Sequence, residues 1–292
     1  MKELKLNQEV FDLYDSYVHN GIGRREFVER LRVYAVGGLT IPMILDYLLP
    51  KYSEAQQVRA GDPRLNSEYI EYDSPKGGGK IRGLLSRPVD NKEKLPGIVV
   101  VHENRGLNPH IEDVARRAAL EGFLSLAPDA LTPLGGYPGN DDDGRALQRQ
   151  RDRNEMLEDF IAAFDYLKGH PECTGKIGVV GFCFGGWISN MMAVRVSDLA
   201  AAVPFYGGQP AAEEVPNIHA PLLLHFAALD ERVNAGWPDY AAALQENNKE
   251  YSAHLYPDVN HGFHNDTTPR YDEAAAKLAW KRTVDFFNAK LR

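Results

Sequence analysis

The segment from Lys176 to Gly186, Lys-Ile-Gly-Val-Val-Gly-Phe-Cys-Phe-Gly-Gly, constrains the fold of this chain more than any other. A run of β-branched residues ends there in Gly-Phe-Cys-Phe-Gly at 181–185. Glycines on both sides of the cysteine let a strand reverse sharply into a helix. The pattern predicts a nucleophile elbow, in which Cys183 stands above a sheet and faces a helix N-terminus that favours a thiolate. The alternative is a buried structural cysteine at a tight strand–helix turn.

Two candidate partners follow the cysteine, each directly after an expected strand. Residues 221–226 read as a buried parallel strand that leads into Asp230, and residues 251–256 alternate like a strand that leads into His261. The order nucleophile, acid, histidine is that of the α/β-hydrolase fold. We therefore expect a triad of Cys183, Asp230 and His261 at the carboxyl edge of a parallel sheet, where ligands bind.

A fourth candidate follows the expected strand at 97–102, which runs into a glycine-containing loop. Glu103 is expected to point into the site beside the cysteine. The pair His102-Glu103 begins like a zinc motif, but Gly106 stands where that motif requires its second histidine. The sequence therefore excludes a zincin site, and we expect neither a metal nor a cofactor.

Glu103, Cys183, Asp230 and His261 in these contexts resemble the dienelactone hydrolase family, whose members are also called carboxymethylenebutenolidases. The resemblance covers roughly residues 67–292. It implies an α/β-hydrolase fold and the hydrolysis of carboxylic esters or lactones through a cysteine–histidine–aspartate triad and a thioester acyl-enzyme.

The same resemblance implies roles for further residues. Glu103 would contact the thiol, and the backbone amides of Phe184 and Asn104 would form the oxyanion hole. The best-known members hold the dienelactone carboxylate with two arginines, and the corresponding loop after residue 129 has none here. Arg105 and Arg270 are the candidate substitutes, and the sequence assigns neither of them. The resemblance therefore implies ester or lactone hydrolysis and leaves open whether dienelactone is the substrate.

Aromatic residues near strand ends are the remaining candidates for contact with a substrate. Tyr137 lies in a Gly/Pro/Asp-rich loop at 132–144, which is either a solvated connection or the rim of a pocket. Tyr206 and Trp187 also fall close to strand ends. A place in the hydrophobic core is the simpler interpretation of each aromatic side chain.

The first sixty residues differ from the rest of the chain. Residues 9–18 have helical periodicity, and a second helical pattern runs to about Leu49. The pair Arg24-Arg25 resembles a twin-arginine export signal, but charges follow it and Asp46 interrupts an apolar run too short for a membrane span. We expect a retained helical extension over residues 1–60 and a cytoplasmic protein. A processed signal and a periplasmic location are the alternative.

Strands alternate with helices through the catalytic region, which is expected at residues 61–292. The expected elements are an antiparallel hairpin (68–72 and 81–87), strands at 97–102, 123–127, 177–180, 200–205, 222–226 and 252–256, and helices at 111–121, 144–169, 184–194, 237–247 and 273–291. This alternation predicts a mostly parallel central sheet covered by helices on both faces, with the N-terminal extension added to it.

Composition narrows the set of partners. The chain has 292 residues and a net charge of −8, with no basic stripe, which argues against a nucleic-acid partner. Its two cysteines do not indicate a disulfide framework. We expect a small-molecule ester or lactone as substrate, no membrane partner, and a homodimer as one option. The alternatives are a thioesterase or acyl transferase on the same triad, or a catalytically weak binding or scaffold protein.

Overall fold

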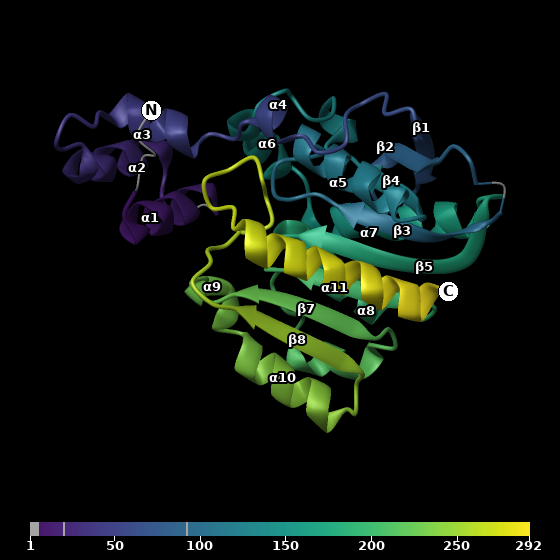
Figure 1. Cartoon of the computed structure of the whole chain (residues 1–292). Helices are drawn as coiled ribbons and strands as arrows, with labels where there is room; N and C mark the ends of the chain where they lie inside the picture. The colour runs from purple at the N-terminus through teal and green to yellow at the C-terminus, as the bar shows by residue number, and fades with distance from the viewer. Residues whose placement is uncertain (1–5, 20, 92) are drawn as a thin grey trace.

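The protein is an eight-stranded sheet flanked by helices, with a small helical unit at its N-terminus (Figure 1). The structure is a computed structural model and describes residues 6–19, 21–91 and 93–292. The strand order is β1-β2-β4-β3-β5-β6-β7-β8. β1 pairs antiparallel with β2 and β2 antiparallel with β4, whereas every later pairing is parallel. The carboxyl ends of the parallel strands therefore meet at one edge.

The strands are β1 (Leu65–Ser74), β2 (Gly79–Pro88), β3 (Leu95–Val101), β4 (Leu124–Pro128), β5 (Cys173–Phe182), β6 (Ala201–Phe205), β7 (Leu222–Ala227) and β8 (Tyr251–Tyr256). The α-helices are α1 (Gln8–Val18), α2 (Arg24–Leu31), α3 (Ile41–Leu48), α4 (Tyr52–Ala55), α5 (Pro109–Leu120), α6 (Asp141–Gln148), α7 (Arg153–Gly169), α8 (Phe184–Arg195), α9 (Glu231–Asn234), α10 (Trp237–Glu246) and α11 (Glu273–Leu291). Short 3₁₀ helices occupy Arg32–Tyr34, Thr132–Leu134 and Ala212–Asn217.

Both faces of the sheet are covered, which explains the uninterrupted apolar character of its central strands. Successive side chains of a strand point to opposite faces. Val99 of β3 accordingly joins a core with α7, α8 and α10, whereas its neighbours Ile98 and Val100 join a second core with α5 and α11. The sequence prediction of an α/β fold with a mostly parallel sheet covered on both faces is confirmed.

The N-terminal helices have an apolar cluster of their own. α1, α2 and α3 contribute its buried members, which are Val10, Tyr14, Val18, Phe27, Leu31, Ile44 and Leu48. The rings of Tyr17 and Phe27 stack beside it with centroids 4.7 Å apart. The side chains assigned to this cluster all come from the first 48 residues, so the unit has a core separate from the two cores of the sheet.

α1 rests against the carboxyl edge of the sheet, beside the loop that precedes α11 (Figure 1). The side-chain contacts that hold it there are largely polar. They join Asn260 to Gln8 (3.2 Å), Arg232 and Arg270 to Asp15 (3.3 Å each), Tyr17 to Asp142 (3.0 Å) and the Asn104 amide to the carbonyl of Val18 (2.8 Å). Hydrogen bonds and ion pairs therefore dock the N-terminal unit onto the catalytic region.

The prediction of a single long helix over residues 144–169 is wrong. α6 ends at Gln148 and α7 begins at Arg153, because Asp152 caps the second helix. The Asp152 carboxylate accepts hydrogen bonds from two first-turn amides of α7, at 2.8 and 3.0 Å. The second helical pattern predicted near the N-terminus, which runs to about Leu49, likewise forms two helices, α2 and α3.

None of the helices in the described ranges has the length and apolar character needed to cross a lipid bilayer.

Candidate active site

The turn between β5 and α8 carries the cysteine in a strained backbone conformation. Cys183 has φ 58° and ψ −110°, a region that L-residues rarely adopt. A Cβ on Gly181 would overlap the carbonyl oxygen of Gly185, and a Cβ on Gly185 would overlap that of Val101. Only glycine fits at both positions, so the chain can reverse here and present Cys183 at the carboxyl edge of the sheet.

The loops after β7 and β8 bring together the acid and the histidine. Nδ1 of His261 lies 2.5 Å from Oδ2 of Asp230, and both side chains are buried. The other carboxylate oxygen of Asp230 caps α9 by accepting from the amide of Val233 (3.2 Å). Nε2 of His261 is buried and has no hydrogen-bond partner among the described residues. Asp230 therefore fixes the ring so that its other nitrogen is free to face the thiol.

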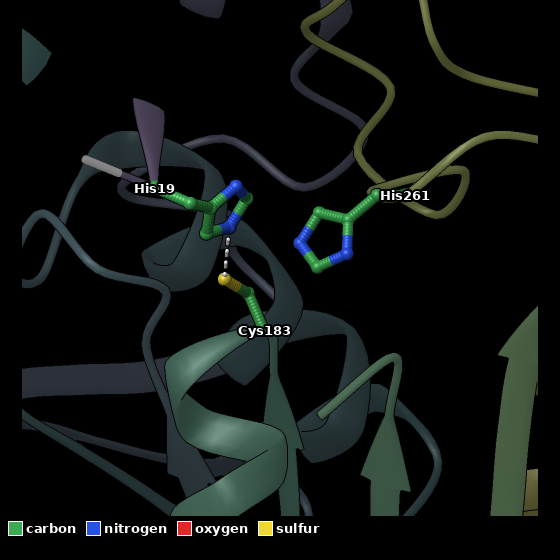
Figure 2. A group of neighbouring side chains, drawn as sticks. All are labelled: His19, Cys183 and His261. Carbon is green, nitrogen blue, oxygen red and sulfur yellow. Dashed lines mark hydrogen bonds between the residues drawn. The ribbon is translucent and has the colours of Figure 1, made fainter. Parts of the chain in front are cut away.

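A second histidine, which the sequence analysis missed, lies directly on the cysteine. Nε2 of His19, at the end of α1, is 3.2 Å from Sγ of Cys183 (Figure 2). Its Nδ1 lies 2.9 Å from the carbonyl oxygen and 3.1 Å from the carboxylate of Asp15, one helical turn earlier. The His19 and His261 rings meet edge to face, with centroids 4.6 Å apart. Two carboxylate–histidine pairs thus converge on one thiol.

These neighbours favour the charged form of each group. Burial alone would raise the pKa of Cys183, but the charges of His19 and His261 lower that pKa well below its ordinary value. Burial alone would lower the pKa of His261, but Asp230, Cys183 and Asp15 raise it to about 10. The pKa of His19 is also raised, by Cys183 and Asp15 against the effect of burial. The surroundings therefore favour a thiolate at Cys183 and protonated rings at His19 and His261.

Glu103 lies at the same edge of the sheet, fully buried. Its carboxylate accepts a hydrogen bond from Asn265 (3.0 Å) and pairs with Arg105 (3.4 Å). Arg105 is itself buried and makes its shorter ion pair with Asp141, at 2.6 Å. Burial would raise the pKa of Glu103, but Arg105 and other positive neighbours lower it, so the carboxylate is charged.

The two amides expected to form the oxyanion hole belong to the turn after β5 and to the loop after β3. Phe184 is the first residue of α8, and a first-turn N–H has no acceptor within its own helix. Asn104 lies in the loop after β3, where its side-chain amide donates to the carbonyl oxygen of Val18 in α1. The N-terminal unit therefore contacts this loop as well as the cysteine.

The aromatic candidates occupy three different surroundings. Tyr206 is buried, has φ 37°, and lies with its ring 4.9 Å from that of His261. Its hydroxyl has no hydrogen-bond partner in the part of the chain that the structure describes. Tyr137 donates to Asp141 (3.0 Å), and the half-buried Trp187 lies under the guanidinium of Arg153 (3.4 Å). Of the three, Tyr206 is the one packed against the histidine.

A cavity of about 430 Å³ opens beside the aspartate–histidine pair. Asp230 and His261 line one side of it, α1 lines the other, and Arg232 and Arg270 also border it. The carboxylate of Asp15 lies between these two arginines, 3.3 Å from a nitrogen of each. The cavity is large enough for a small organic substrate, and its lining mixes these two arginines with carboxylates, among them Asp12 and Glu231.

Comparisons with known proteins identify the family. A family model described as dienelactone hydrolase family matches residues 81–291, and a second model, described as YqhI-like, matches residues 1–35. A protein of Saccharolobus solfataricus, provisionally named a carboxymethylenebutenolidase, is 31% identical over 74% of this chain and 96% of its own length. A hydrolase fragment of Escherichia coli K12, YghX, is 55% identical over 39% of this chain and 97% of its own.

Among solved structures, a provisionally named dienelactone hydrolase of Klebsiella pneumoniae is similar to 76% of this chain and 99% of its own, with a TM-score of 0.67 and 26% identity.

Proposed function

The chain belongs to the dienelactone hydrolase family, and we propose that this hydrolase of carboxylic esters or lactones acts through Cys183, Asp230 and His261. The observation that carries the proposal is the buried Asp230–His261 pair, whose free ring nitrogen faces the cysteine of the strained turn. A nucleophile, a base and a group that orients the base are the parts that covalent acyl transfer requires.

In the first half-reaction the thiolate of Cys183 attacks the carbonyl carbon of the substrate. The negative charge moves to the carbonyl oxygen, which accepts hydrogen bonds from the backbone amides of Phe184 and Asn104. One donor of this kind typically contributes about 3–4 kcal/mol. Collapse of the intermediate breaks the C–O bond, the leaving alkoxide takes the proton from the imidazolium of His261, and a thioester remains on Cys183.

In the second half-reaction His261, now neutral, takes a proton from water as that water attacks the thioester. Collapse releases the carboxylic acid and restores the thiolate–imidazolium pair. Asp230 keeps the proton of the ring on Nδ1, so Nε2 stays available in both halves. The buried carboxylate of Glu103 is engaged by Arg105, so we do not assign it as this base. We assign it a positioning role, in which it holds Arg105 and the loop that carries Asn104.

The proposal is tested by substitution of the cysteine. Cys183→Ala is expected to abolish nearly all hydrolysis of p-nitrophenyl acetate while circular dichroism stays unchanged. Cys173→Ala is the matched control, because Cys173 is also buried but its pKa is raised by that burial. Mass spectrometry should find an acyl group on Cys183 in the parent and none in Cys183→Ala. If Cys183→Ala kept most of the activity on every ester that the parent cleaves, the proposed triad would be wrong.

We also propose that residues 1–60 are retained in the working, cytoplasmic enzyme rather than removed as an export signal. His19 on the thiol and the Val18 carbonyl on Asn104 support this proposal, since removal of the segment would strip two contacts from the site. The mass of the protein isolated from its own cells decides the question. A chain that begins near Ala55 would contradict retention.

A further inference from the structure

The cysteine has one more carboxylate–histidine pair than the proposed triad uses. Asp230–His261 supplies the base, and the same geometry is repeated by Asp15–His19 from the opposite side. Sγ of Cys183 and one ring nitrogen of each histidine lie within 4.8 Å of one another, with the cysteine and His261 buried and His19 half-buried. Acyl transfer through a thioester needs only one such pair, so the second requires its own explanation.

We propose that His19, Cys183 and His261 form a binding site for a thiophilic divalent cation, with Zn²⁺ as the best match. A thiolate and two imidazoles are ligands that Zn²⁺ prefers, and three protein ligands with one open position are typical of its reactive sites. Hard cations such as Mg²⁺ and Ca²⁺ bind through oxygen ligands, which this set lacks.

The distances are close to those of a zinc site. With bonds of about 2.3 Å to sulfur and about 2.0 Å to nitrogen, ligands of a tetrahedral Zn²⁺ lie roughly 3.3–3.6 Å apart. Nε2 of His19 already lies 3.2 Å from Sγ of Cys183, and the spread of 4.8 Å over the three atoms closes with shifts of about an ångström. Figure 2 shows both rings turned toward the space beside the sulfur.

The groups behind the ligands also fit a metal site. Histidines that bind zinc usually donate their other ring N–H to a carboxylate or a backbone carbonyl, which fixes the ring and makes the free nitrogen a better ligand. Nδ1 of His261 is held by Asp230, and Nδ1 of His19 is held by the backbone carbonyl and one carboxylate oxygen of Asp15. Nε2 of His261 is buried without a partner among the described residues, which leaves it free to bind a cation.

The nearby arginines restrict which cation the site accepts. Arg232 and Arg270 each pair with Asp15, so that carboxylate is engaged and offers no free oxygen to a hard cation. A metal that bonds to sulfur and nitrogen does not need that oxygen. The surroundings therefore favour Zn²⁺ over hard divalent cations of the same charge.

Binding would switch the enzyme off. The metal would displace the proton from the binding nitrogen of each ring, and these protons would pass to solvent. The electron pair with which Cys183 attacks a carbonyl would be donated to the metal, and His261 would lose the nitrogen that accepts a proton. This consequence rests on the proposed function, whereas the binding itself does not. Removal of the metal by a chelator would return the same thiolate, so inhibition is expected to be reversible.

The binding test uses the full chain, reduced and freed of metal with EDTA. Zn²⁺ is titrated in competition with a chromogenic chelator, and Co²⁺ is added in parallel as a spectroscopic probe. We expect one tightly bound ion per chain and a thiolate-to-Co²⁺ charge-transfer band, which only a cysteine ligand produces. Zn²⁺ should also block iodoacetamide labelling of Cys183 until EDTA is added.

Variants assign the ligands. Loss of a group behind a ligand costs about 10- to 100-fold in metal affinity, so Asp15→Asn should weaken Zn²⁺ binding by that factor and His19→Ala by at least as much. His219→Gln changes an exposed histidine away from the site and should leave the affinity unchanged. Unchanged affinity in a folded His19→Ala would overturn the proposal. If His19→Ala does not fold, absence of the charge-transfer band in the parent would overturn it equally.

These readouts separate the two proposals. Metal stoichiometry, the Co²⁺ spectrum and alkylation need no substrate, so they decide the metal site even if Cys183→Ala remains active on esters. Conversely, if the parent binds no Zn²⁺ but depends on Cys183 for hydrolysis, the proposed triad stands and the proposed metal site is wrong.

Discussion

Replacing His19 by glutamine isolates the contribution of the second histidine to the reactivity of Cys183. The substitution removes a positive charge 3.2 Å from the sulfur and leaves Asp230 and His261 in place. A hydrogen bond to a charged group typically contributes about 1.5–3 kcal/mol, and the side chain of His19 is only 13% exposed, so screening by water is small. Because about 1.4 kcal/mol is tenfold, the ratio of thiolate to thiol should fall roughly 10- to 100-fold.

The assay is the initial rate of iodoacetamide labelling of Cys183, followed by mass spectrometry across acidic and neutral pH. Only the thiolate reacts, and the lowered pKa of Cys183 keeps the parent reactive in acid. Loss of the His19 charge raises that pKa, so His19→Gln should lose reactivity first as the pH falls. Cys173, whose pKa is raised, serves as an internal reference that labels only at high pH.

A His219→Gln variant controls for the loss of any histidine. If His19→Gln and the parent gave the same labelling profile, His19 would not stabilise the thiolate, and the short N–S contact would have no electrostatic consequence. If both variants shifted equally, the effect would be one of net charge and not of position.

Three further outcomes are expected from the geometry. Asp230→Asn should lower kcat for p-nitrophenyl acetate by up to about 10⁴-fold with an unchanged circular dichroism spectrum, because the imidazole would then adopt the wrong tautomer. Gly181→Ala should destabilise the protein to chemical denaturation by about 1–3 kcal/mol or more, since its Cβ would overlap backbone atoms, whereas Gly169→Ala, with open space around it, should be near neutral. Asp159→Ala should cost about 3–5 kcal/mol in the same measurement, because it removes the nearer of the two carboxylates that pair with the buried guanidinium of Arg151, at 3.0 Å, and the acceptor of the Ser74 hydroxyl.

The sequence predicted those parts of the site that follow from local rules. The turn at Cys183 is set by glycines at fixed spacing, and those glycines are needed because a Cβ would not fit. Asp230 and His261 follow buried strands, and the ends of parallel strands meet at one edge. Local pattern and sheet geometry together therefore predict that Asp230 and His261, which are 31 residues apart in the chain, lie at the same edge of the sheet.

His19 was not predictable by the same reasoning. It lies 164 residues from Cys183 in the chain, at the end of a helix whose periodicity reports only which face is apolar. Asp15 and His19 fall one turn apart on the polar face, a spacing equally typical of a solvated surface. Their role depends on how the N-terminal unit docks, and the side-chain contacts that fix this docking are long-range and polar. The break before α7 depends on the capping carboxylate of Asp152, which a helical pattern does not distinguish from an aspartate on the helix surface.

The separate apolar cluster of α1, α2 and α3 has a consequence for how the enzyme responds to its medium. Because that cluster is complete within the first 48 residues, detaching the unit from the catalytic region would expose little apolar surface. What would be broken are charged contacts at Asp15 and polar contacts around it. Salt screens buried pairs only weakly, so it should act mainly on the more exposed pair between Arg232 and Asp15. Because denaturant sensitivity scales with the surface that is exposed, uncovering of the thiol should depend less on denaturant than unfolding of the sheet does.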